Sequence, residues 1–301
     1  YSWNICKSQA EKGFISVQFS CMIVDGKQGS LQKEGTKKSV KICKRCRSFR
    51  KGCNMKILIK NGHVIDPDTK LDQVADVLLE DDKIQEVKEN IKDKADRVID
   101  ARGCYVMPGL IDMHVHLRDP GLTHKEDVFT GSKAAASGGV TTLVAMPNTK
   151  PVIDNPERLS YVKNKAMQCN LVNVLQAGAI TQGMKGEELS DIEGMVQAGA
   201  PAISEDGKSV MNAQIYKEAM QIAARMNIPV LAHCEDIHMV NGGCMNEDTN
   251  SEKFGLPGIC NAVEDTIVAR DILIAKDTGC HLHLCHCSTK DRCFIILYRY
   301  Q

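Results

Sequence analysis

The chain has 301 residues, with 38 acidic and 38 basic side chains and 43% hydrophobic residues. The balanced charge excludes a global attraction to nucleic acid or to a membrane surface, and the length is sufficient to bury a large core. No hydrophobic run approaches the ~20 residues that a membrane-spanning helix needs, and residues 1–12 do not have the pattern of a signal peptide. The 14 cysteines are scattered without the spacing of a disulfide framework, which is typical of reduced thiols and predicts a cytoplasmic protein.

Residues 1–54 differ from the rest of the chain, because they are rich in Lys, Ser, Cys and Gln and show no sustained helical or strand period. The stretch 37–51 is strongly basic, and Cys43 and Cys46 form one C-x-x-C pair. One such pair supplies half of the four ligands of a structural zinc site, and charge runs are usually solvated, so neither feature predicts a zinc module or nucleic-acid binding. A regular strand pattern begins only at Met55. We therefore expect residues 1–54 to be an extension that is disordered or translated from sequence upstream of the domain.

Residues 55–107 predict a series of short β-strands. Residues 55–60 are β-prone and precede Asn61-Gly62, a hairpin-turn signal. Residues 74–87 predict a second hairpin, and two further strands are expected at 97–101 and 104–107. Because so few residues can bury only a small core of their own, we expect this part to pack against another part of the protein.

From residue 108 to residue 290 the pattern alternates between strands and helices, which is typical of a parallel sheet covered by helices. Gly138-Gly139 predicts the end of one helix, Ser190 the start of a capping box, and Gly279 the end of a helix that Asn261 caps. Six strands are expected, at 111–117, 141–146, 172–177, 201–204, 230–233 and 281–287. They predict an α/β fold with about six of the eight units of a (β/α)8 barrel.

Potential metal ligands follow the ends of these strands. His114 and His116 lie two residues apart, so they share one face of a strand, and Arg118 two residues further can bind an anionic substrate beside them. Three more potential ligands follow later strands: Asp206, His233 and His286. The carboxyl ends of parallel strands meet at one face of a barrel. Four imidazoles and a carboxylate are more ligands than one tetrahedral zinc ion with an open coordination position can take. They suit two ions bridged by a carboxylate and a hydroxide.

Each of these residues also has a purely structural interpretation. A single histidine at the end of a strand often makes only a structural hydrogen bond, and Asp206 alone can cap a helix or a turn. The shared position at strand ends favours the metal site over these interpretations. His281 and His283 precede the end of their strand, and we interpret them as structural.

Five segments of this region carry a specific family pattern. They are 108–120 with His-Val-His-Leu-Arg, Met-Pro-Asn-Thr at 146–149, Ser-Glu-Asp-Gly at 204–207, Ala-His-Cys-Glu-Asp at 232–236 and Cys-His-Cys-Ser-Thr at 285–289. Together they resemble a bacterial class I dihydroorotase of the amidohydrolase superfamily, over residues 55–290. The resemblance implies a metallo-dependent hydrolase barrel, incomplete over residues 108–290, and a small β-sandwich of which residues 55–107 form the N-terminal part.

The resemblance also implies an activity and a ligand set. The activity is the zinc-dependent, reversible cyclisation of N-carbamoyl-L-aspartate to L-dihydroorotate in pyrimidine (UMP) biosynthesis. His114 and His116 would bind the first zinc ion, and His233 and His286 the second. Asp206 and a hydroxide would bridge the two Zn²⁺ ions.

Arg118 and Asn148 would bind the substrate carboxylate, which suits a guanidinium and an amide donor. Glu205 stands where the family commonly has another Asp, next to the bridging position. The partners that the resemblance implies are the small-molecule substrate and, in the intact family member, a second copy in a homodimer or an aspartate transcarbamoylase.

Two other interpretations remain open. A cyclic-amide hydrolase of the hydantoinase, dihydropyrimidinase or allantoinase type would bridge its metals with a carboxylated lysine on the fourth strand. Residues 201–204 contain no lysine, and Lys208 is offset by two positions from Asp206. The second interpretation is a non-catalytic, metal-binding homologue.

The resemblance stops after Lys290, and residues 291–301 form a tail unlike the family. The catalytic Asp that the family carries on strand eight, in an Asp-His-Ala-Pro-like stretch, does not occur in these 301 residues. We therefore assign no catalytic residue and expect this chain, which we interpret as C-terminally truncated, to be inactive.

Overall fold

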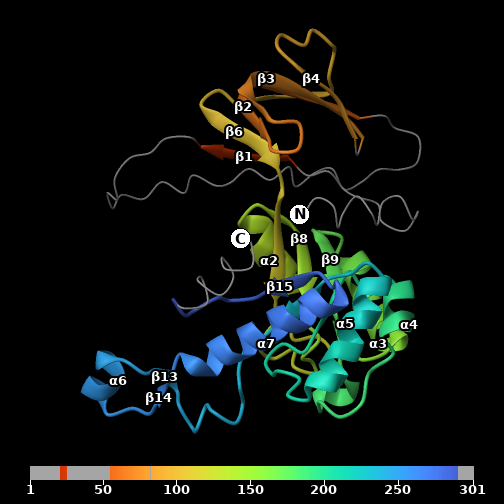
Figure 1. Ribbon diagram of the computed structural model, residues 1–301. Coiled ribbons are helices and arrows are strands. Elements are labelled where there is room, and N and C mark those ends of the chain that lie inside the picture. Colours follow the sequence, from red (N-terminus) through yellow and green to blue (C-terminus); the bar gives the residue numbers. More distant parts are fainter. Residues whose placement is uncertain (1–20, 26–54, 82, 291–301) are drawn as a thin grey trace. The chain divides into compact units, whose positions relative to one another are not determined.

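The structure is a computed structural model that describes residues 21–25, 55–81 and 83–290 (Figure 1). Its described residues form two units. The first comprises 21–25, 55–81, 83–112, 129–143 and 169–173, and the second 113–128, 144–168 and 174–290. The basic stretch 37–51, the pair Cys43 and Cys46 and the tail 291–301 lie outside the described residues, as does all of the extension 1–54 except 21–25.

A six-stranded sheet forms most of the first unit (Figure 1). Its strands are β1 (Cys21–Asp25), β2 (Lys56–Asp66), β3 (Leu71–Glu80), β4 (Lys83–Lys88), β5 (Arg97–Asp100) and β6 (Cys104–Pro108). The order is β1-β6-β2-β3-β4, and β5 also pairs with β2. β2 runs antiparallel to β3 and parallel to β5 and β6, so each β-prone segment expected within 55–107 forms a strand.

The hairpin turn expected at Asn61-Gly62 is wrong. β2 continues through both residues, and its register against β3 shifts between Ile59 and Gly62, which is a β-bulge. Asn61 takes a left-handed φ of 60°, and a Cβ on Gly62 would collide with the side chain of Val106 on β6. The Asn-Gly pair therefore forms a bulge, where β6 approaches β2 closely. The chain turns only at residues 67–70.

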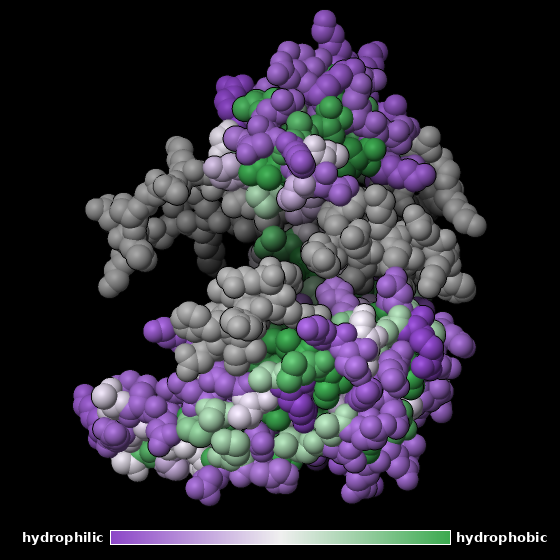
Figure 2. Space-filling model, in the orientation of Figure 1, coloured by the Kyte–Doolittle hydropathy of each residue, from purple (hydrophilic) through white to green (hydrophobic). Residues whose placement is uncertain are grey.

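A buried aspartate stabilises this bulge. Asp76 on β3 is 3% exposed, and its two carboxylate oxygens accept hydrogen bonds from the backbone N–H groups of Asn61 (2.8 Å) and Ile91 (3.0 Å). The Nζ of Lys60 lies 3.8 Å away. Hydrophobic side chains pack in the core around it, Ile59 and Val77 among them, and hydrophilic ones cover most of this unit's face in Figure 2.

The strands from β7 onward form two further sheets, in which neighbouring strands follow one another in chain order. β7 (Leu110–Val115), β8 (Val140–Ala145) and β9 (Asn173–Gln176) form one sheet, and β10 (Gly178–Ala179), β11 (Ile203–Ser204), β12 (Val230–Ala232) and β15 (Leu282–Leu284) form another. The three neighbouring pairs of the second sheet are parallel. All six expected strands are present, although the third is divided into β9 and β10. The α/β fold with about six barrel units is confirmed.

Helices connect these strands (Figure 1). They are α2 (Val128–Ser137), α3 (Pro156–Cys169), the 3-10 turn η1 (Gln182–Met184), α4 (Ile192–Gln197), α5 (Ala213–Arg225), α6 (Thr249–Phe254) and α7 (Ala262–Thr278). Two short strands that pair in parallel, β13 (Met245–Asn246) and β14 (Gly258–Ile259), flank α6. Within the second unit α5 contacts both α4 and α7. Among the described residues, no helix is both long and apolar enough to cross a membrane.

The capping box expected at Ser190 is wrong. The N-cap of α4 is Asp191, whose carboxylate accepts a hydrogen bond from the N–H of Gly194 at 3.0 Å. Ser190 instead donates its hydroxyl to the carbonyl of Ala179 at 2.6 Å, a contact between segments far apart in sequence. Asn261 precedes α7 without a side-chain cap, and Gly279 ends α7 in the expected left-handed conformation.

Candidate metal centre

The second unit brings the five expected ligands together around one carboxylate. Asp206 follows β11 and is 3% exposed. The Nε2 of His114 lies 3.1 Å from its Oδ1, and the Nε2 of His116 lies 3.4 Å from its Oδ2. The Nδ1 of His233 and the Nε2 of His286 lie 3.5 Å and 3.4 Å from Oδ1. Histidines from β7, from the end of β12 and from the end of β15 thus face the same buried group.

The backbone after β11 aims Asp206 at these imidazoles. The hydroxyl of Ser204 donates to the carbonyl of Leu231 on β12 at 2.7 Å and accepts from the N–H of Asp206 at 3.1 Å. Gly207 follows with a left-handed φ of 85°, and a Cβ there would lie 3.2 Å from the amide nitrogen of Asn148. A glycine at 207 therefore lets the chain turn away directly after the ligand.

Asn148, which follows β8, connects two of the ligands. Its Nδ2 donates to Oδ2 of Asp206 at 3.3 Å, and its Oδ1 lies 3.0 Å from Nδ1 of His116. Because an amide oxygen only accepts, the Nδ1 of His116 carries the proton. The Nε2 of neutral His116 then presents its lone pair toward Asp206, which is the state that binds a metal ion.

Glu235 fixes the position of the ring proton of His233 in the same way. Its Oε2 lies 2.8 Å from the Nε2 of His233, so that nitrogen donates and Nδ1 remains as the lone-pair donor. The Nδ1 of His233 lies 3.0 Å from the Nε2 of His286. Sequence reasoning assigned no role to Glu235. The signal that would have found it is its place two residues after His233, within reach of the ring.

The charges of the site perturb one another. Burial alone would raise the pKa of Asp206, but the neighbouring imidazoles of His114, His233 and His286 outweigh it and hold that pKa well below its usual range. Burial also opposes protonation of His233, yet Asp206 and Glu235 raise its pKa. Burial lowers the pKa of His116, and the positive charge of Arg118 acts in the same direction. An anionic carboxylate thus lies beside imidazoles of unequal basicity.

These donors fit a pair of divalent ions. Within the described residues, two groups have ligand atoms that all lie within 4.8 Å of one another, namely His114–His116–Asp206 and Asp206–His233–His286. Both groups contain Asp206, which offers two oxygens. Imidazole nitrogen and carboxylate oxygen are the ligands of zinc and of several other transition metals.

The two residues expected to bind substrate lie beside this centre in different ways. Asn148 is bonded to it as described, whereas β7 ends at Val115 and Arg118 has a left-handed φ of 57°. The alternation of a strand therefore does not extend to Arg118. Its neighbour Asp119 is 1% exposed and binds Lys165 (Nζ to Oδ2, 2.6 Å) on α3, which holds the loop that carries Arg118.

Two other residues near Asp206 have structural contacts. Glu205 is buried and accepts from the N–H groups of Ile180 and Thr181, both at 3.1 Å, and from the hydroxyl of Thr181. Burial raises the pKa of Glu205. Lys208 donates its Nζ to the carbonyl of Met184 at 3.2 Å. Asp206 is therefore the acidic group of this segment that faces the histidines.

A partial (β/α)8 barrel with histidines and a shared aspartate at the ends of its strands is the arrangement of the amidohydrolase class of proteins. Residues 103–292 match the family model described as Dihydro-orotase-like. The chain belongs to this dihydroorotase family. It is 49% identical to the dihydroorotase of Geotalea daltonii over 243 residues, which are 80% of this chain and 57% of that protein.

Other relatives give the same result. The dihydroorotase of Ruminiclostridium cellulolyticum is 47% identical over 236 residues, covering 78% of this chain and 55% of the relative. The chain thus spans a little over half the length of the curated relatives it matches. Among solved structures, an L-hydantoinase from Arthrobacter aurescens superposes with a TM-score of 0.68 at 25% identity, covering 81% of this chain and 55% of that one. A D-hydantoinase from a Thermus species gives 0.62 at 26% identity, with the same coverage.

Proposed function

We propose that this protein acts in a dihydroorotase reaction, the reversible cyclisation of N-carbamoyl-L-aspartate to L-dihydroorotate in pyrimidine biosynthesis. The observation that carries the proposal is one buried carboxylate, Asp206, with four imidazole nitrogens within 3.1–3.5 Å of its oxygens. The relatives named dihydroorotase support the reaction. The cytoplasm is the proposed location, with the small-molecule substrate as partner and a homodimer or an aspartate transcarbamoylase as candidate assemblies.

The proposed cofactor is a pair of zinc ions. His114 and His116 would hold one ion, His233 and His286 the other, and Asp206 both. Bound divalent ions of this kind activate a water molecule and polarise an amide carbonyl. The chain's own contribution is to fix the tautomer and the orientation of two imidazoles, which Asn148 and Glu235 do through their hydrogen bonds to His116 and His233.

Substrate recognition is proposed for Arg118 and Asn148. Both substrate and product carry a carboxylate, and a guanidinium binds a carboxylate through two parallel hydrogen bonds. Asn148 has two N–H donors, one of which is directed at Asp206, so the other is available for a ligand. Replacement of Arg118 by Met should therefore weaken substrate binding and leave the metal content unchanged.

A second candidate is a cyclic-amide hydrolase of the hydantoinase type, which the solved hydantoinase structures favour through their fold. Their type bridges its metals with a carboxylated lysine. In this chain Asp206 occupies the central position, and the nearest lysine in sequence, Lys208, is bonded to the carbonyl of Met184. The donor set therefore favours the dihydroorotase reaction.

The experiment compares metal content and turnover in the same preparation. Zinc per chain is measured after dialysis, and turnover is measured with L-dihydroorotate, hydantoin and allantoin. Two equivalents of zinc together with a preference for dihydroorotate support the proposal, and faster turnover of hydantoin or allantoin would replace it with the second candidate. Asp76→Asn, which alters a buried aspartate remote from the histidines in sequence and contacts, is the matched control for stability.

Metal binding and turnover are expected to separate in this chain. The 301 residues contain no Asp-His-Ala-Pro stretch, and loss of a general acid–base group typically costs ~10²–10⁴-fold in rate. We propose that a polypeptide of these residues alone binds zinc and turns over dihydroorotate slowly. A rate equal to that of the Geotalea daltonii enzyme would contradict this part of the proposal, and zinc bound without any turnover would favour a non-catalytic homologue.

A further inference from the structure

Helix α7 contacts the loop that follows Asp206. The Nη1 of Arg270, in the middle of α7, donates to the carbonyl of Val210 at 3.0 Å and to that of Met211 at 3.4 Å. Its guanidinium also lies over the ring of buried Tyr216 on α5, 5.2 Å from the centroid. These two carbonyls lie just before Asn212, the N-cap of α5, so Arg270 holds the end of this loop.

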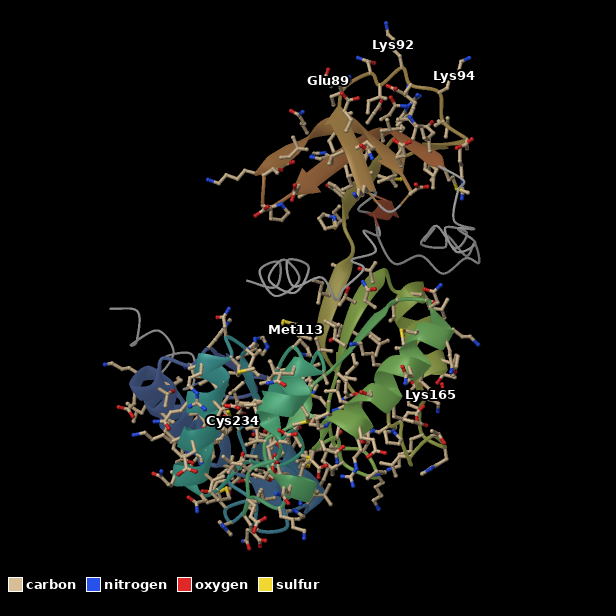
Figure 3. The ribbon with its side chains drawn as sticks, turned by 90° about the vertical axis from the view of Figure 1, so that its right-hand side faces the viewer. Glu89, Lys92, Lys94, Met113, Lys165 and Cys234 are labelled. Carbon is tan, nitrogen blue, oxygen red and sulfur yellow. The ribbon has the colours of Figure 1, made fainter. Side chains whose placement is uncertain are left out.

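The same loop holds the backbone of His233. The hydroxyl of Ser209 donates to the carbonyl of His233 at 2.6 Å and accepts from the N–H of Glu235 at 3.0 Å. Between them, Cys234 is buried against hydrophobic residues of α7 (Figure 3). Through Ser209, the loop therefore holds the backbone of His233 and that of Glu235, whose carboxylate orients the ring of His233.

A second contact from α7 reaches the same segment. Asp271 is 1% exposed, and the Sγ of Cys234 lies 3.9 Å from its Oδ2. Its Oδ1 accepts from the Nε of Arg270 at 2.8 Å. The pair Arg270 and Asp271 thus contacts the loop after β11 and the segment after β12 at once.

The first turn of α7 holds the third ligand segment. The carboxylate of Glu264 accepts from the N–H of Ser288 at 3.1 Å, and Asp265 accepts from the hydroxyl of Thr289. Ser288 lies two residues after His286. One helix therefore supports the loop that follows Asp206 and the segments that carry His233 and His286.

The loop after His116 has a different support. There, buried Asp119 binds Lys165 at 2.6 Å and Tyr161 at 3.1 Å, both on α3; Figure 3 labels Lys165 on this helix. Asp206 itself is held by Ser204 and Asn148, neither of which belongs to α7. Displacing α7 from its contacts therefore moves His233 and His286 relative to Asp206 and leaves His114 and His116 in place.

We propose that Arg270 is a positioning residue for the metal ion held by Asp206, His233 and His286, and that it acts on this ion and not on the one held by His114, His116 and Asp206. The inference rests on the proposed two-metal site. It adds that α7 supports the ligands of one ion and α3 supports the loop after His116, a ligand of the other. Partners of this kind, one step removed from the ligands, typically change metal affinity by ~10–100-fold.

The test is a titration of the metal-free full chain with Co²⁺, followed by its visible absorption. Arg270→Met keeps an unbranched, flexible side chain at this position and removes its donors. We expect one of two Co²⁺ equivalents to bind at least ~10-fold more weakly, in the pattern given by His233→Ala and not by His116→Ala. Arg270→Lys, which restores one donor, should recover part of the loss.

Two further variants keep the result decisive. Asp76→Asn is the matched control, because it also disturbs a buried carboxylate network, and it should lower stability without changing either Co²⁺ equivalent. If Arg270→Met does not fold, Glu264→Ala tests the other end of α7 by the same criterion, because Glu264 holds Ser288 from a more exposed position.

The outcomes separate the two proposals. Two wild-type Co²⁺ equivalents in Arg270→Met, or an equal loss of both, would overturn the role of Arg270 and leave the metal site standing. If the wild-type chain binds no Co²⁺, the metal proposal fails and the role of Arg270 fails with it.

Discussion

Asp76 in the first unit and Asp206 in the second are equally buried, at 3% exposure each, yet their surroundings differ in kind. The oxygens of Asp76 accept from two backbone N–H groups, which hold a bulge and a loop in place. The oxygens of Asp206 face four imidazole nitrogens, which are groups that can bind a metal ion. Burial of a carboxylate therefore does not identify a site. The decisive property is whether its neighbours are donors fixed by the backbone or groups that can exchange a proton for a metal ion.

Replacement of Asp206 should produce the largest effect. Asp206→Asn removes a charged ligand common to both groups, so we expect loss of at least ~100-fold in affinity for each divalent ion. The metal-free variant should keep its secondary structure, because the backbone around it is held by Ser204. Zinc content and circular dichroism of the same sample check both statements. Retention of one full zinc equivalent would show that Asp206 is not common to both ions.

A third buried aspartate, Asp271, extends the comparison, because its ionisation should make the stability of the protein depend on pH. Burial raises the pKa of Asp271 to about 6, above its ordinary value of 3.8, despite the charge of Arg270. A carboxyl whose pKa is raised on folding favours the folded state below pH ~4, and this contribution is lost as the pH rises through ~6. At 1.36 kcal/mol per unit, its size is on the order of 2–3 kcal/mol.

Urea unfolding of wild type and Asp271→Asn between pH 4 and 7 measures this contribution as the difference between the two free energies. Other titrating groups are shared by both chains and cancel. We expect the wild type to lose stability relative to the variant as the pH rises. A constant difference across this range would show that Asp271 is ionised throughout.

Asp76→Asn should have a smaller effect, confined to stability. The amide keeps one acceptor for Asn61 or Ile91 and leaves the other N–H without a charged partner, at a cost of about 1–2 kcal/mol in the free energy of unfolding. Urea denaturation measures this change. Zinc content should stay at the wild-type value, and a loss of zinc would remove the distinction between the two aspartates.

An exposed ion pair gives the smallest expected effect. Arg225 and Glu193 lie 3.1 Å apart with 61% and 54% of their side-chain surfaces exposed. Pairs of this kind contribute ~0–1 kcal/mol, so Arg225→Ala should change the free energy of unfolding by less than about 0.5 kcal/mol. A larger change would mean that the contact of α5 with α4 depends on this pair.

The sequence by itself determined the positions of the six barrel strands, the ends of several helices and the residue types that gather around Asp206. Those features follow from local patterns: apolar runs, glycine at helix ends, and polar residues directly after strands. The hairpin turn predicted at Asn61-Gly62 was wrong, because the same residue pair also suits a β-bulge.

Only the tertiary structure decided how that geometry is used. Asn61-Gly62 forms a bulge because Val106 and Asp76, distant in sequence, close around it. Ser190 does not cap α4 because its hydroxyl is bonded to the carbonyl of Ala179 on β10. The ring orientation of His116 and the contacts of α7 with three ligand segments arise from hydrogen bonds between segments far apart in the chain. Such contacts leave no periodic signal in a single sequence, because their geometry exists only once the chain has folded.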